Sequence, residues 1–463
     1  MTASSSHIGR TGVLVLAAGK GTRMHSDKPK VLQTMLEEPM LHYVLAATAE
    51  LAGKDETWTV IGHGADMVRA AMGDGRTQFI EQKEQLGTGH ALATAWPALK
   101  AAGVSHVLVV NGDTPRISGG VLQGFVDKSI AFGADLAFIT LTPPDAGAFG
   151  RVLRKNGRVT AIIEAKDYDE ARFGPCPREI NAGIYCIRAA VLDALLPRLG
   201  NANKSGEFYI TDLVELAVAD KLTVLGAEAG DDMNLLGVNT PGELAAAEEA
   251  ERERIVADWL AAGVLIHNAG QVRISPRAIL EPGAELAGPL EIYGSSVIRA
   301  GARVDSHTRM TDSSVDSGAI VRSFCHLEGA VIGPDCVAGP FSRMRPGAVL
   351  EEGAHVGSFV EMKKSRLRKG AKANHLAYIG DADIGERVNI GAGVITCNYD
   401  GKNKHATVIG NDAFIGSNVS LVAPVSVGAG ALVGAGSVIT KNVAEKTLAL
   451  GRARQTELPL RKK

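Results

Sequence analysis

The chain has 463 residues, which at about 150 residues per domain predicts about three domains. Lys and Arg (49) nearly balance Asp and Glu (51), so the chain lacks the basic excess of proteins whose main partner is nucleic acid. Hydrophobic residues make up 45% and charged residues 22%, which excludes disorder along the whole chain. Glycine is frequent (54 residues) and aromatic residues are scarce (5%), so we expect many turns and an aliphatic core.

No segment has the pattern of an export signal or a transmembrane helix. The first apolar run, residues 13–18, ends at Gly19 and is too short for either. The cysteines form no C-x-x-C pair, so we expect neither a disulfide framework nor a zinc site, and we expect a reducing, cytoplasmic location. They are Cys176, Cys186, Cys325, Cys336 and Cys397.

The first half of the chain alternates short apolar runs with segments of helical spacing. Buried strands are predicted at residues 13–18, 58–62, 107–110 and 136–140, and helices at 40–51 and 89–99. This alternation predicts an α/β domain over residues 1–238 with a mostly parallel sheet, in which ligands bind at the carboxyl ends of the strands.

A connecting helix is predicted over residues 239–262. Thr240 stands at the N-cap, Pro241 at the first helical position and Glu243 at the third, which is a capping box. The run that follows has helical character and mixed charge, and Gly263 ends it.

From residue 263 to residue 463 the pattern is a six-residue repeat of aliphatic residues. A period of six fits neither a helix nor a hairpin, and it is typical of a parallel β-helix in which one aliphatic per strand points inward. The polar segment between Thr396 and Ile409 breaks the phase, so we expect it to loop out. The repeat is clearest in three series: 292, 298, 304 and 310; 338, 344, 350, 356 and 362; and 409, 415, 421, 427, 433 and 439.

A glycine-rich string, LAAGKGTRMHSDKPK, follows the first strand at residues 16–30. Such a turn exposes backbone N–H groups to phosphate, and Arg23 and Lys30 add positive charge, although both also fit an exposed turn. Asp113 follows the strand at residues 107–110 and suits Mg²⁺, although an aspartate there also forms turns. The string resembles the signature of sugar-phosphate nucleotidyltransferases.

Joined to the hexapeptide repeat, the string resembles a bacterial family that combines N-acetylglucosamine-1-phosphate uridyltransferase and glucosamine-1-phosphate N-acetyltransferase activities. The resemblance covers nearly the whole chain. It rests on EQLGTGHA, EINAGIY, GEFYITD, GVNT, RPGA, FVEMKK, NHLAYIGDA, NIGAG and ITCNYDGKNKH. It implies an α/β nucleotidyltransferase domain, a left-handed β-helix, a homotrimer and the synthesis of UDP-N-acetylglucosamine for cell-envelope polymers.

For uridylyl transfer, the resemblance places Mg²⁺ on Asp113 and Asn239, and Arg23 and Lys30 on the phosphates of UTP. The uridine nucleotide would meet Leu16, Ala17, Ala18, Gly19, Gln82, Gly87 and Thr88. The sugar side and the turn beside the metal would involve Asn111, Gly112, Gly150, Glu164 and Asn181. Gly150, Glu164 and Asn181 also fit ordinary loop positions. Asn111 stands where many members have tyrosine and Ala182 where threonine is common, which bears on substrate preference.

For acetyl transfer, His375 matches the general base of the family and Glu361 is a carboxylate that could orient it. Without the resemblance, His375 fits a structural role, and the basic residues around 363–372 fit a solvated face. The resemblance places Arg345, Lys363, Tyr378 and Asn389 on the sugar phosphate. It places Ala392, Asn398, Tyr399, Ser417, Ala435 and Arg452 on acetyl-CoA, in a groove between subunits.

An alternative hypothesis is a nucleotidyltransferase whose β-helix only assembles or regulates. The motifs NHLAYIG and CNYDGKNKH favour the two-activity enzyme, because a purely structural coil needs neither. With the connecting helix, two domains fit the chain better than the three that its length predicts.

Overall fold

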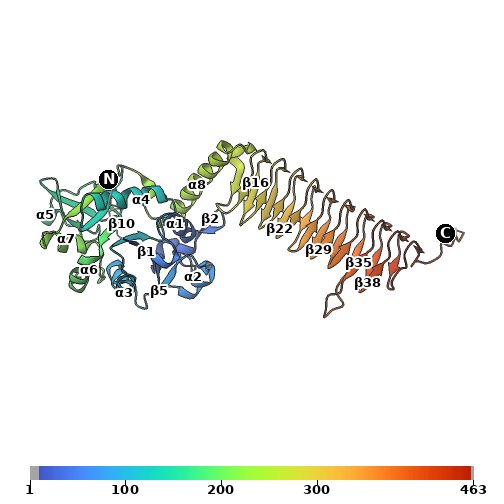
Figure 1. Ribbon diagram of the computed structural model, residues 1–463, viewed down its shortest axis with the longest axis horizontal. Coiled ribbons are helices and arrows are strands. Elements are labelled where there is room, and N and C mark those ends of the chain that lie inside the picture. The colour runs from blue at the N-terminus through green and yellow to red at the C-terminus, as the bar shows by residue number, and fades with distance from the viewer. Residues whose placement is uncertain (1–9, 74, 460–463) are drawn as a thin grey trace, which may run out of the picture. The chain divides into compact units, whose positions relative to one another are not determined.

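The computed structural model of the chain describes residues 10–73 and 75–459 (Figure 1). The chain divides into two compact units, Met1–Glu249 and Ala250–Lys463, and the boundary falls inside helix α8, Pro241–Ala261. The expected division at residues 238 and 262, which treats this helix as a separate connector, stays a prediction. None of the helices in the described part has the length and apolar character needed to cross a bilayer.

The first unit is built on a mixed sheet with the strand order β11-β7-β10-β6-β1-β4-β5. β1 pairs in parallel with β4 on one side and with β6 on the other, so the chain changes direction across the sheet at β1. The four predicted strands are β1, β4, β6 and β7. The parallel order is interrupted by β10, which follows the β8–β9 hairpin and runs antiparallel between β6 and β7. The bounds are β1 Thr11–Ala17, β4 Thr57–Ile61, β5 Gln78–Glu81, β6 His106–Asn111, β7 Leu136–Leu141, β8 Arg151–Lys155, β9 Arg158–Ile163, β10 Ile180–Arg188 and β11 Val224–Glu228, with the short pair β2 Thr34–Met35 and β3 Glu38–Pro39.

Helices cover both faces of this sheet because side chains alternate along each strand. Val13 and Val15 of β1 join the core under α1, α2 and α4, whereas Leu14 joins the core under α3, α6 and α7. The two predicted helices correspond to α1 and α3. The bounds are α1 Met40–Thr48, α2 Ala65–Met72, α3 Thr88–Ala101, α4 Gly119–Ala131, α5 Glu170–Phe173, α6 Ala189–Leu195 and α7 Asp212–Ala219, with 3-10 helices η1 Thr22–Met24, η2 Lys30–Leu32, η3 Lys54–Glu56, η4 Leu196–Arg198, η5 Met233–Leu235 and η6 Ala269–Gln271.

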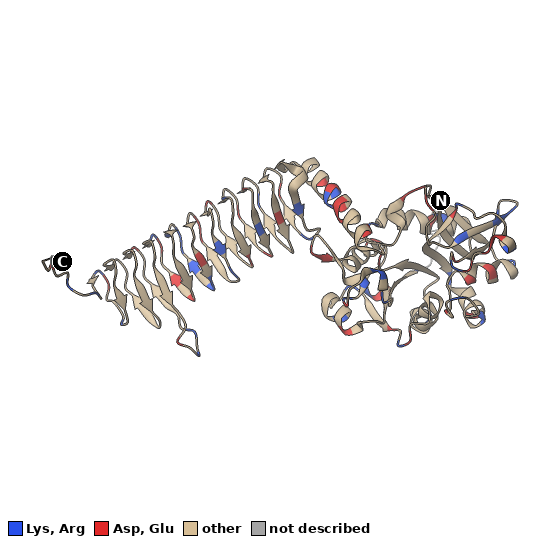
Figure 2. Ribbon diagram, turned by 180° about the vertical axis from the view of Figure 1, so that it is seen from behind, with Lys and Arg blue, Asp and Glu red and all other residues tan. Residues whose placement is uncertain are grey.

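Helix α8 begins with the predicted capping box. Thr240 Oγ1 accepts a hydrogen bond from Glu243 N (3.2 Å), and Glu243 Oε2 accepts from Thr240 N (3.2 Å) and from Asn239 N (2.5 Å). The helix ends where Gly263 takes a positive φ of 90°, a conformation that suits glycine. Figure 2 shows acidic and basic residues alternating along the helix, as its sequence predicts.

The second unit is a left-handed parallel β-helix, as expected. Each coil contributes one short strand to each of three parallel sheets, and strands of successive coils stack in register. The aliphatic residues of the three series are all buried, for example Met310, Leu350 and Ile439. Because one aliphatic per strand fills the narrow interior, the coil needs few aromatic residues inside.

The strands are short and follow the six-residue repeat. In the first sheet they are β12 Leu265–His267, β15 Glu285–Ala287, β18 Arg303–Val304, β21 Ile320–Val321, β24 Val337–Ala338, β27 His355–Ser358, β30 Lys372–His375, β33 Asn389–Ile390, β36 Phe414–Ile415, β39 Leu432–Val433 and β41 Leu448–Ala449. In the second sheet they are β13 Val272–Ile274, β16 Leu290–Tyr293, β19 Thr308–Thr311, β22 His326–Glu328, β25 Arg343–Met344, β28 Glu361–Lys363, β31 Tyr378–Gly380, β34 Ile395–Cys397, β37 Ser420–Val422 and β40 Val438–Ile439. In the third sheet they are β14 Ile279–Leu280, β17 Val297–Ile298, β20 Ser314–Val315, β23 Val331–Ile332, β26 Ala348–Leu350, β29 Ser365–Leu367, β32 Ala382–Ile384, β35 Thr407–Ile409 and β38 Val425–Val427.

The segment between β34 and β35 leaves the coil as a loop, as predicted, and it projects from the coil beside β35 (Figure 1). Tyr399 and Lys404 pair across it as an antiparallel bridge. Asp400 closes the tip by accepting from the backbone N–H groups of Lys402 (2.8 Å) and Asn403 (2.7 Å) and by pairing with His405 Nε2 (2.7 Å). These contacts hold the pKa of Asp400 well below its usual range, with His405 the largest cause.

Candidate active sites

A pocket of about 580 Å³ opens in the first unit at the carboxyl end of β1. The sheet changes direction at this strand, and such switch points leave a crevice where ligands bind. The pocket is lined by ten of the residues expected to contact nucleotide, sugar or metal: Leu16, Ala17, Ala18, Gly19, Lys30, Gln82, Gly87, Thr88, Asn111 and Asp113. It is also lined by Lys20, Gln85 and Glu207, which lie in the quoted motifs but were not predicted to contact a ligand.

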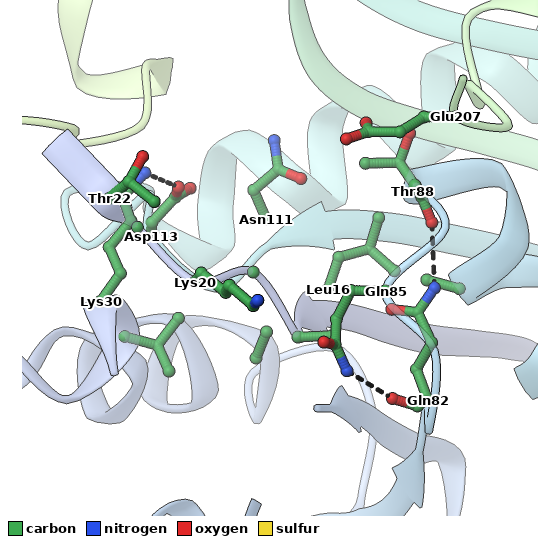
Figure 3. A pocket seen from close by; sticks show the side chains of 17 residues that line it. Leu16, Lys20, Thr22, Lys30, Gln82, Gln85, Thr88, Asn111, Asp113 and Glu207 are labelled. Atoms are coloured by element: carbon green, nitrogen blue, oxygen red, sulfur yellow. Dashed lines mark hydrogen bonds and ion pairs between the residues drawn. The ribbon is translucent and has the colours of Figure 1, made fainter. Parts of the chain in front are cut away.

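One end of the pocket holds the expected metal ligands and cations together. Lys30 Nζ donates a hydrogen bond to Asp113 Oδ2 and another to Asn239 Oδ1 (2.7 Å). Arg23 Nη2 donates to the same Asn239 oxygen (2.7 Å). Figure 3 shows Lys30 pointing toward Asp113 at this end, while Gln82, Gln85 and Thr88 lie at the other. Asp113 and Asn239 therefore direct one oxygen each toward a single cationic group.

Two glycines allow this convergence. Gly21 has a φ of +62°, and a Cβ built on it would lie 2.5 Å from Cβ of Lys30, so the loop after β1 closes tightly over the lysine. A Cβ built on Gly237 would lie 2.7 Å from Asp113 Oδ1, so a side chain there would displace the carboxylate. The backbone bond from Val238 N to Asp113 O (2.8 Å) fixes the two loops to each other.

The oxygen donors fit a magnesium ion. Mg²⁺ takes few protein ligands and retains water and phosphate oxygens, so one carboxylate and one amide oxygen aimed at one point are a suitable pair. Lys30 Nζ lies within hydrogen-bond distance of both oxygens, so the two oxygens lie close to each other. Among the described residues, no group of three or more His, Cys, Asp or Glu forms a fuller metal cage.

At the opposite end, polar contacts position the loop before α3. Gln82 Nε2 donates to Gly87 O (3.1 Å) and lies 2.9 Å from His90 Nδ1. Thr88 Oγ1 accepts from Ile210 N (3.1 Å). Gln82 itself is buried, so its amide is fixed where a base could be recognised.

The expected sugar-side residues form a second group. Asn181 N donates to Gly150 O (2.9 Å), and Asn181 Nδ2 donates to Tyr185 Oη (2.6 Å). A Cβ on Gly150 would lie 3.5 Å from Glu164 Oε1, so Gly150, Glu164 and Asn181 lie together. They do not line the pocket at the end of β1. Asn111 connects the two groups, because a Cβ on Gly183 would lie 2.4 Å from Asn111 Nδ2 and Gly183 N donates to Asn181 Oδ1 (3.0 Å). Gly112 does not line the pocket, but it lies beside Ala17, which does.

Carboxylates around this second group are partly withdrawn from water. Burial raises the pKa of Glu164 above its ordinary value, against the hydrogen bond that Thr211 Oγ1 donates to it (3.1 Å). Burial also raises the pKa of Asp212 to about 6, and the charge of Glu164 adds to this rise. The second group is thus an acidic, partly dry environment that suits hydroxyl donors.

The second candidate site lies in the β-helix, at the corner between the first and second sheets. His375 ends β30 at this corner and is exposed. In the coils that follow, the same corner carries Ala392, Ser417 and Ala435. Their backbones stack, because Asn418 N donates to Ala392 O (2.7 Å) and Gly436 N to Ser417 O (2.8 Å). Arg452 Nη1 donates to Ala435 O (2.9 Å), which brings the fourth expected residue to the same edge.

Cations gather at the end of the second sheet that leads toward the third sheet. Glu361 pairs in register with Tyr378, and Lys363 lies at the end of the same strand, β28. Arg345 Nη1 donates to Glu361 Oε1 (2.9 Å). The ammonium of Lys404, from the projecting loop, lowers the pKa of Lys363 most strongly, and Arg345 adds to the effect. Figure 2 shows charged residues of both signs on the middle strands of the coil.

The residues expected for acetyl transfer do not all lie together in the coil. Glu361 bonds to Arg345, and within the described residues it makes no hydrogen bond to His375. Asn389 lies on the first sheet, opposite Lys372, whereas Tyr378 lies on the second. Asn398 Nδ2 donates to Asp381, and Tyr399 is 60% exposed on the loop. Lys404 was not assigned from the sequence, because a lysine in a polar loop gives no signal of the side chains it meets.

Comparison with known proteins identifies the family. Residues 13–154 match the family model of the MobA-like NTP transferase domain, and residues 406–441 match that of the bacterial transferase hexapeptide (six repeats). A protein of Nitratidesulfovibrio vulgaris, "Bifunctional protein GlmU", is 62% identical over 98% of this chain and 99% of its own length. Two proteins of the same name also match over nearly their whole length. The one from Lawsonia intracellularis is 45% identical over 98% of each chain, and the one from Heliobacterium modesticaldum is 44% identical over 96% of each chain.

The chain belongs to the bifunctional GlmU family.

Membership confirms the expectation of an enzyme with two transferase activities. The GlmU nucleotidyltransferase activity corresponds to the mixed sheet of the first unit, and the acyltransferase activity to the hexapeptide coil of the second. The alternative of a purely structural coil is therefore not supported. The expected substrates are small molecules, nucleotides among them.

Proposed function

We propose that the pocket of the first unit transfers UMP from UTP to N-acetylglucosamine 1-phosphate, with release of pyrophosphate. The observation that carries this assignment is the convergence of Lys30, Asp113 and Asn239 at one end of the pocket. Nucleotidyl transfer depends on neutralising charge at the α-phosphate and on aligning the nucleophile. Mg²⁺, held by Asp113 and Asn239, would supply much of that neutralisation when bound.

The residues of this unit have separate tasks. Lys30 and Arg23 hold negative charge on the triphosphate, and the backbone of residues 16–19 contacts the nucleotide. Gln82, Gly87 and Thr88 hold the base end. Asn111 and Gly112, with Gly150, Glu164 and Asn181, hold the acceptor sugar, because Asn111 is the residue that reaches from the pocket to the second group.

We propose that the coil acetylates glucosamine 1-phosphate from acetyl-CoA. The sugar amine attacks the thioester carbonyl, His375 accepts the proton that the nitrogen loses, and the C–S bond breaks to release CoA as the thiol. The cations Arg345 and Lys363, joined by Lys404, bind the sugar phosphate, and Tyr378 and Asn389 bind the sugar. Glu361 positions Arg345 through their 2.9 Å bond and acts on His375 only through the surrounding charge. Acetyl-CoA lies along the corner that carries Ala392, Ser417, Ala435 and Arg452, beside Asn398 and Tyr399.

We propose that the active form is a homotrimer. At the corner between the first and second sheets, His307, Phe324, Phe341 and Phe359 form an exposed ladder of stacked rings, with centroids 4.7–5.2 Å apart. Farther along the coil, the outer face of the first sheet carries exposed Phe414, Leu432 and Leu448. The corner between the third and first sheets carries ion pairs instead, such as Glu352–Lys369 and Arg387–Asp412. An apolar edge beside a charged one favours association through the apolar edge.

The location that we propose is the cytoplasm. All five cysteines are free thiols. Burial raises the pKa of Cys186 to about 12 and those of Cys325 and Cys336 to about 11. Such thiols are unreactive and suit a reducing compartment.

The deciding experiment incubates the full chain with glucosamine 1-phosphate, acetyl-CoA, UTP and Mg²⁺ and detects UDP-N-acetylglucosamine by mass spectrometry. Asp113→Asn should stop UTP consumption and leave acetylation of glucosamine 1-phosphate intact. His375→Ala should stop acetylation and leave UTP consumption intact when N-acetylglucosamine 1-phosphate is supplied directly. If either variant, still folded and associated as the unaltered protein is, lost both activities, the assignment of two independent sites would be wrong.

A further inference from the structure

A second cavity, of about 250 Å³, lies in the first unit behind the loop that carries Asp113. We call it the α8 pocket, because the first turns of α8 form one wall. Its lining is mostly apolar and includes Phe149, Met233, Leu236, Val238 and Ala246. Met233 is 53% exposed, which is high for a large apolar side chain, so apolar surface extends to the opening. No residue of this pocket is assigned above to a substrate or to the metal ion.

Arg116 is the cationic residue in the lining of the α8 pocket. Its Nε is buried, and no side-chain or backbone oxygen of the described residues accepts a hydrogen bond from it. A guanidinium presents a rigid fork of donors that matches a carboxylate, and leaving a buried donor without an acceptor costs free energy. Because this Nε has almost no accessible surface, a ligand in the pocket would meet the terminal nitrogens of Arg116, which also have no hydrogen-bond or ion-pair partner among the described residues. The pocket therefore combines mostly apolar walls with one unpaired guanidinium and one carboxylate, Glu243, which accepts from Asn239 N.

We propose that the α8 pocket binds a small amphipathic carboxylate, with its head group on Arg116 and its apolar body against Phe149, Met233 and Leu236. Hexanoate, with one carboxylate and a short apolar chain, has this chemistry. A sugar or a nucleotide does not fit this site, because the apolar walls would leave its hydroxyl groups without partners.

An occupant of this pocket lies against the residues that position the metal ligands. Val238 lines the pocket and donates through its backbone N to Asp113 O (2.8 Å). Glu243, in the same lining, accepts from Asn239 N (2.5 Å). Because of these two contacts, we expect occupancy to change the Mg²⁺ concentration that supports half-maximal nucleotide turnover. This second effect rests on the proposed function, whereas binding does not.

The test measures binding of hexanoate to the full chain by isothermal titration calorimetry, with hexanol and acetate as separate arms. Hexanoate should bind, whereas hexanol lacks the charge and acetate lacks the apolar body, so both should bind about tenfold more weakly or worse. Arg116→Gln should weaken hexanoate binding about tenfold and Arg116→Lys less, because the ammonium keeps the charge without the fork. Arg158→Gln, at an exposed arginine of β9, is the matched control and should bind as the unaltered protein does.

Absence of hexanoate binding at millimolar concentration would overturn the proposal, as would equal binding of hexanol or of the Arg116→Gln variant. The hexanol comparison uses the unaltered protein, so it decides the question even if the glutamine variant unfolds. A shift in the Mg²⁺ requirement is measured separately on active enzyme. If hexanoate binds without such a shift, the α8 pocket is a binding site, but its occupancy does not affect the metal ligands. If the proposed uridylyl transfer is wrong, the enzyme will show no UTP turnover even when no hexanoate is added.

Discussion

Lys30 Nζ lies 2.7 Å from Asn239 Oδ1, although 209 positions separate the two residues in the chain. The contact joins the loop after β1 to the segment that leads into α8. It brings the ammonium of Lys30 to an oxygen that we assign to the metal site. The same ammonium also donates a hydrogen bond to the carboxylate of Asp113. The end of the pocket is therefore built from three segments distant in sequence, and each of them is open to a direct test.

Replacing Lys30 by Met should lower UTP turnover by roughly 10²–10³-fold, because the variant keeps the stem and removes a charge aimed at the phosphates. The measurement is the steady-state rate of pyrophosphate release. Lys28→Met, two residues earlier in the same loop, is the control and should retain most activity. A Lys30→Met enzyme with an unchanged rate would exclude the lysine from phosphate binding.

Removal of divalent metal should separate the two activities. With EDTA present, UTP consumption should fall to background and return when Mg²⁺ is added, whereas acetyl transfer from acetyl-CoA should continue at its original rate. The physical reason is that acetyl transfer needs only a proton-accepting nitrogen, which His375 supplies. Nucleotidyl transfer needs neutralisation of the charge on the phosphates. Acetylation that also stopped in EDTA would show that the coil has a metal requirement that the structure does not predict.

Thr240→Ala should weaken the start of α8 and, through it, the metal site. Loss of the capping hydroxyl, which accepts from Glu243 N, should lower the free energy of unfolding by about 1 kcal/mol. Glu243 also holds the backbone of Asn239, so the Mg²⁺ concentration for half-maximal UTP turnover should rise. Urea unfolding and a Mg²⁺ titration give the two values, and Thr240→Ser should restore both because serine keeps the hydroxyl.

Asp212→Asn should stabilise the protein above about pH 6 and leave it unchanged below about pH 4. The folded pKa of Asp212, about 6, exceeds the ordinary value of 3.8, so folding becomes less favourable as pH rises between them. Two pH units correspond to about 3 kcal/mol, which we reduce to about 1 kcal/mol because the group is only partly buried.

Urea unfolding of the Asp212→Asn variant near neutral pH and near pH 4 measures this difference. Asp231→Asn, an exposed position, is the control and should show no change at either pH. A stabilisation that is equal at both pH values would mean that packing, and not ionisation, accounts for the effect.

Replacement of Phe324 and Phe341 by Ser should dissociate the proposed trimer. The two rings stack 4.9 Å apart and are about half exposed, so burying them against another copy would gain roughly 25 cal/mol per Å². Multi-angle light scattering after gel filtration measures the mass, and acetyl transfer should fall with it. Val331→Ser, at an exposed position of the third sheet, should leave the mass unchanged. An intact trimer in the double variant would place the interface elsewhere.

Periodicity and local signals determined much of this protein. The six-residue repeat predicted which residues fill the coil, because one buried aliphatic per strand is a local requirement. The capping box around Thr240 and Glu243 was readable because its partners lie three residues apart. The loop around Asp400 could be predicted because its sequence interrupts the six-residue repeat. The family resemblance added the residue types of both sites.

Only the tertiary structure decided which of these residues meet. The sequence did not reveal that Glu361 bonds to Arg345, that Lys404 reaches Lys363, or that Arg116 faces an apolar pocket without an acceptor. Nor did it show β10 running antiparallel inside the sheet. Such contacts join segments far apart in the chain, and they depend on strand order and loop closure, which no local pattern encodes. The sequence alone determined the repeating units and the chemistry available, and the fold decided the pairings.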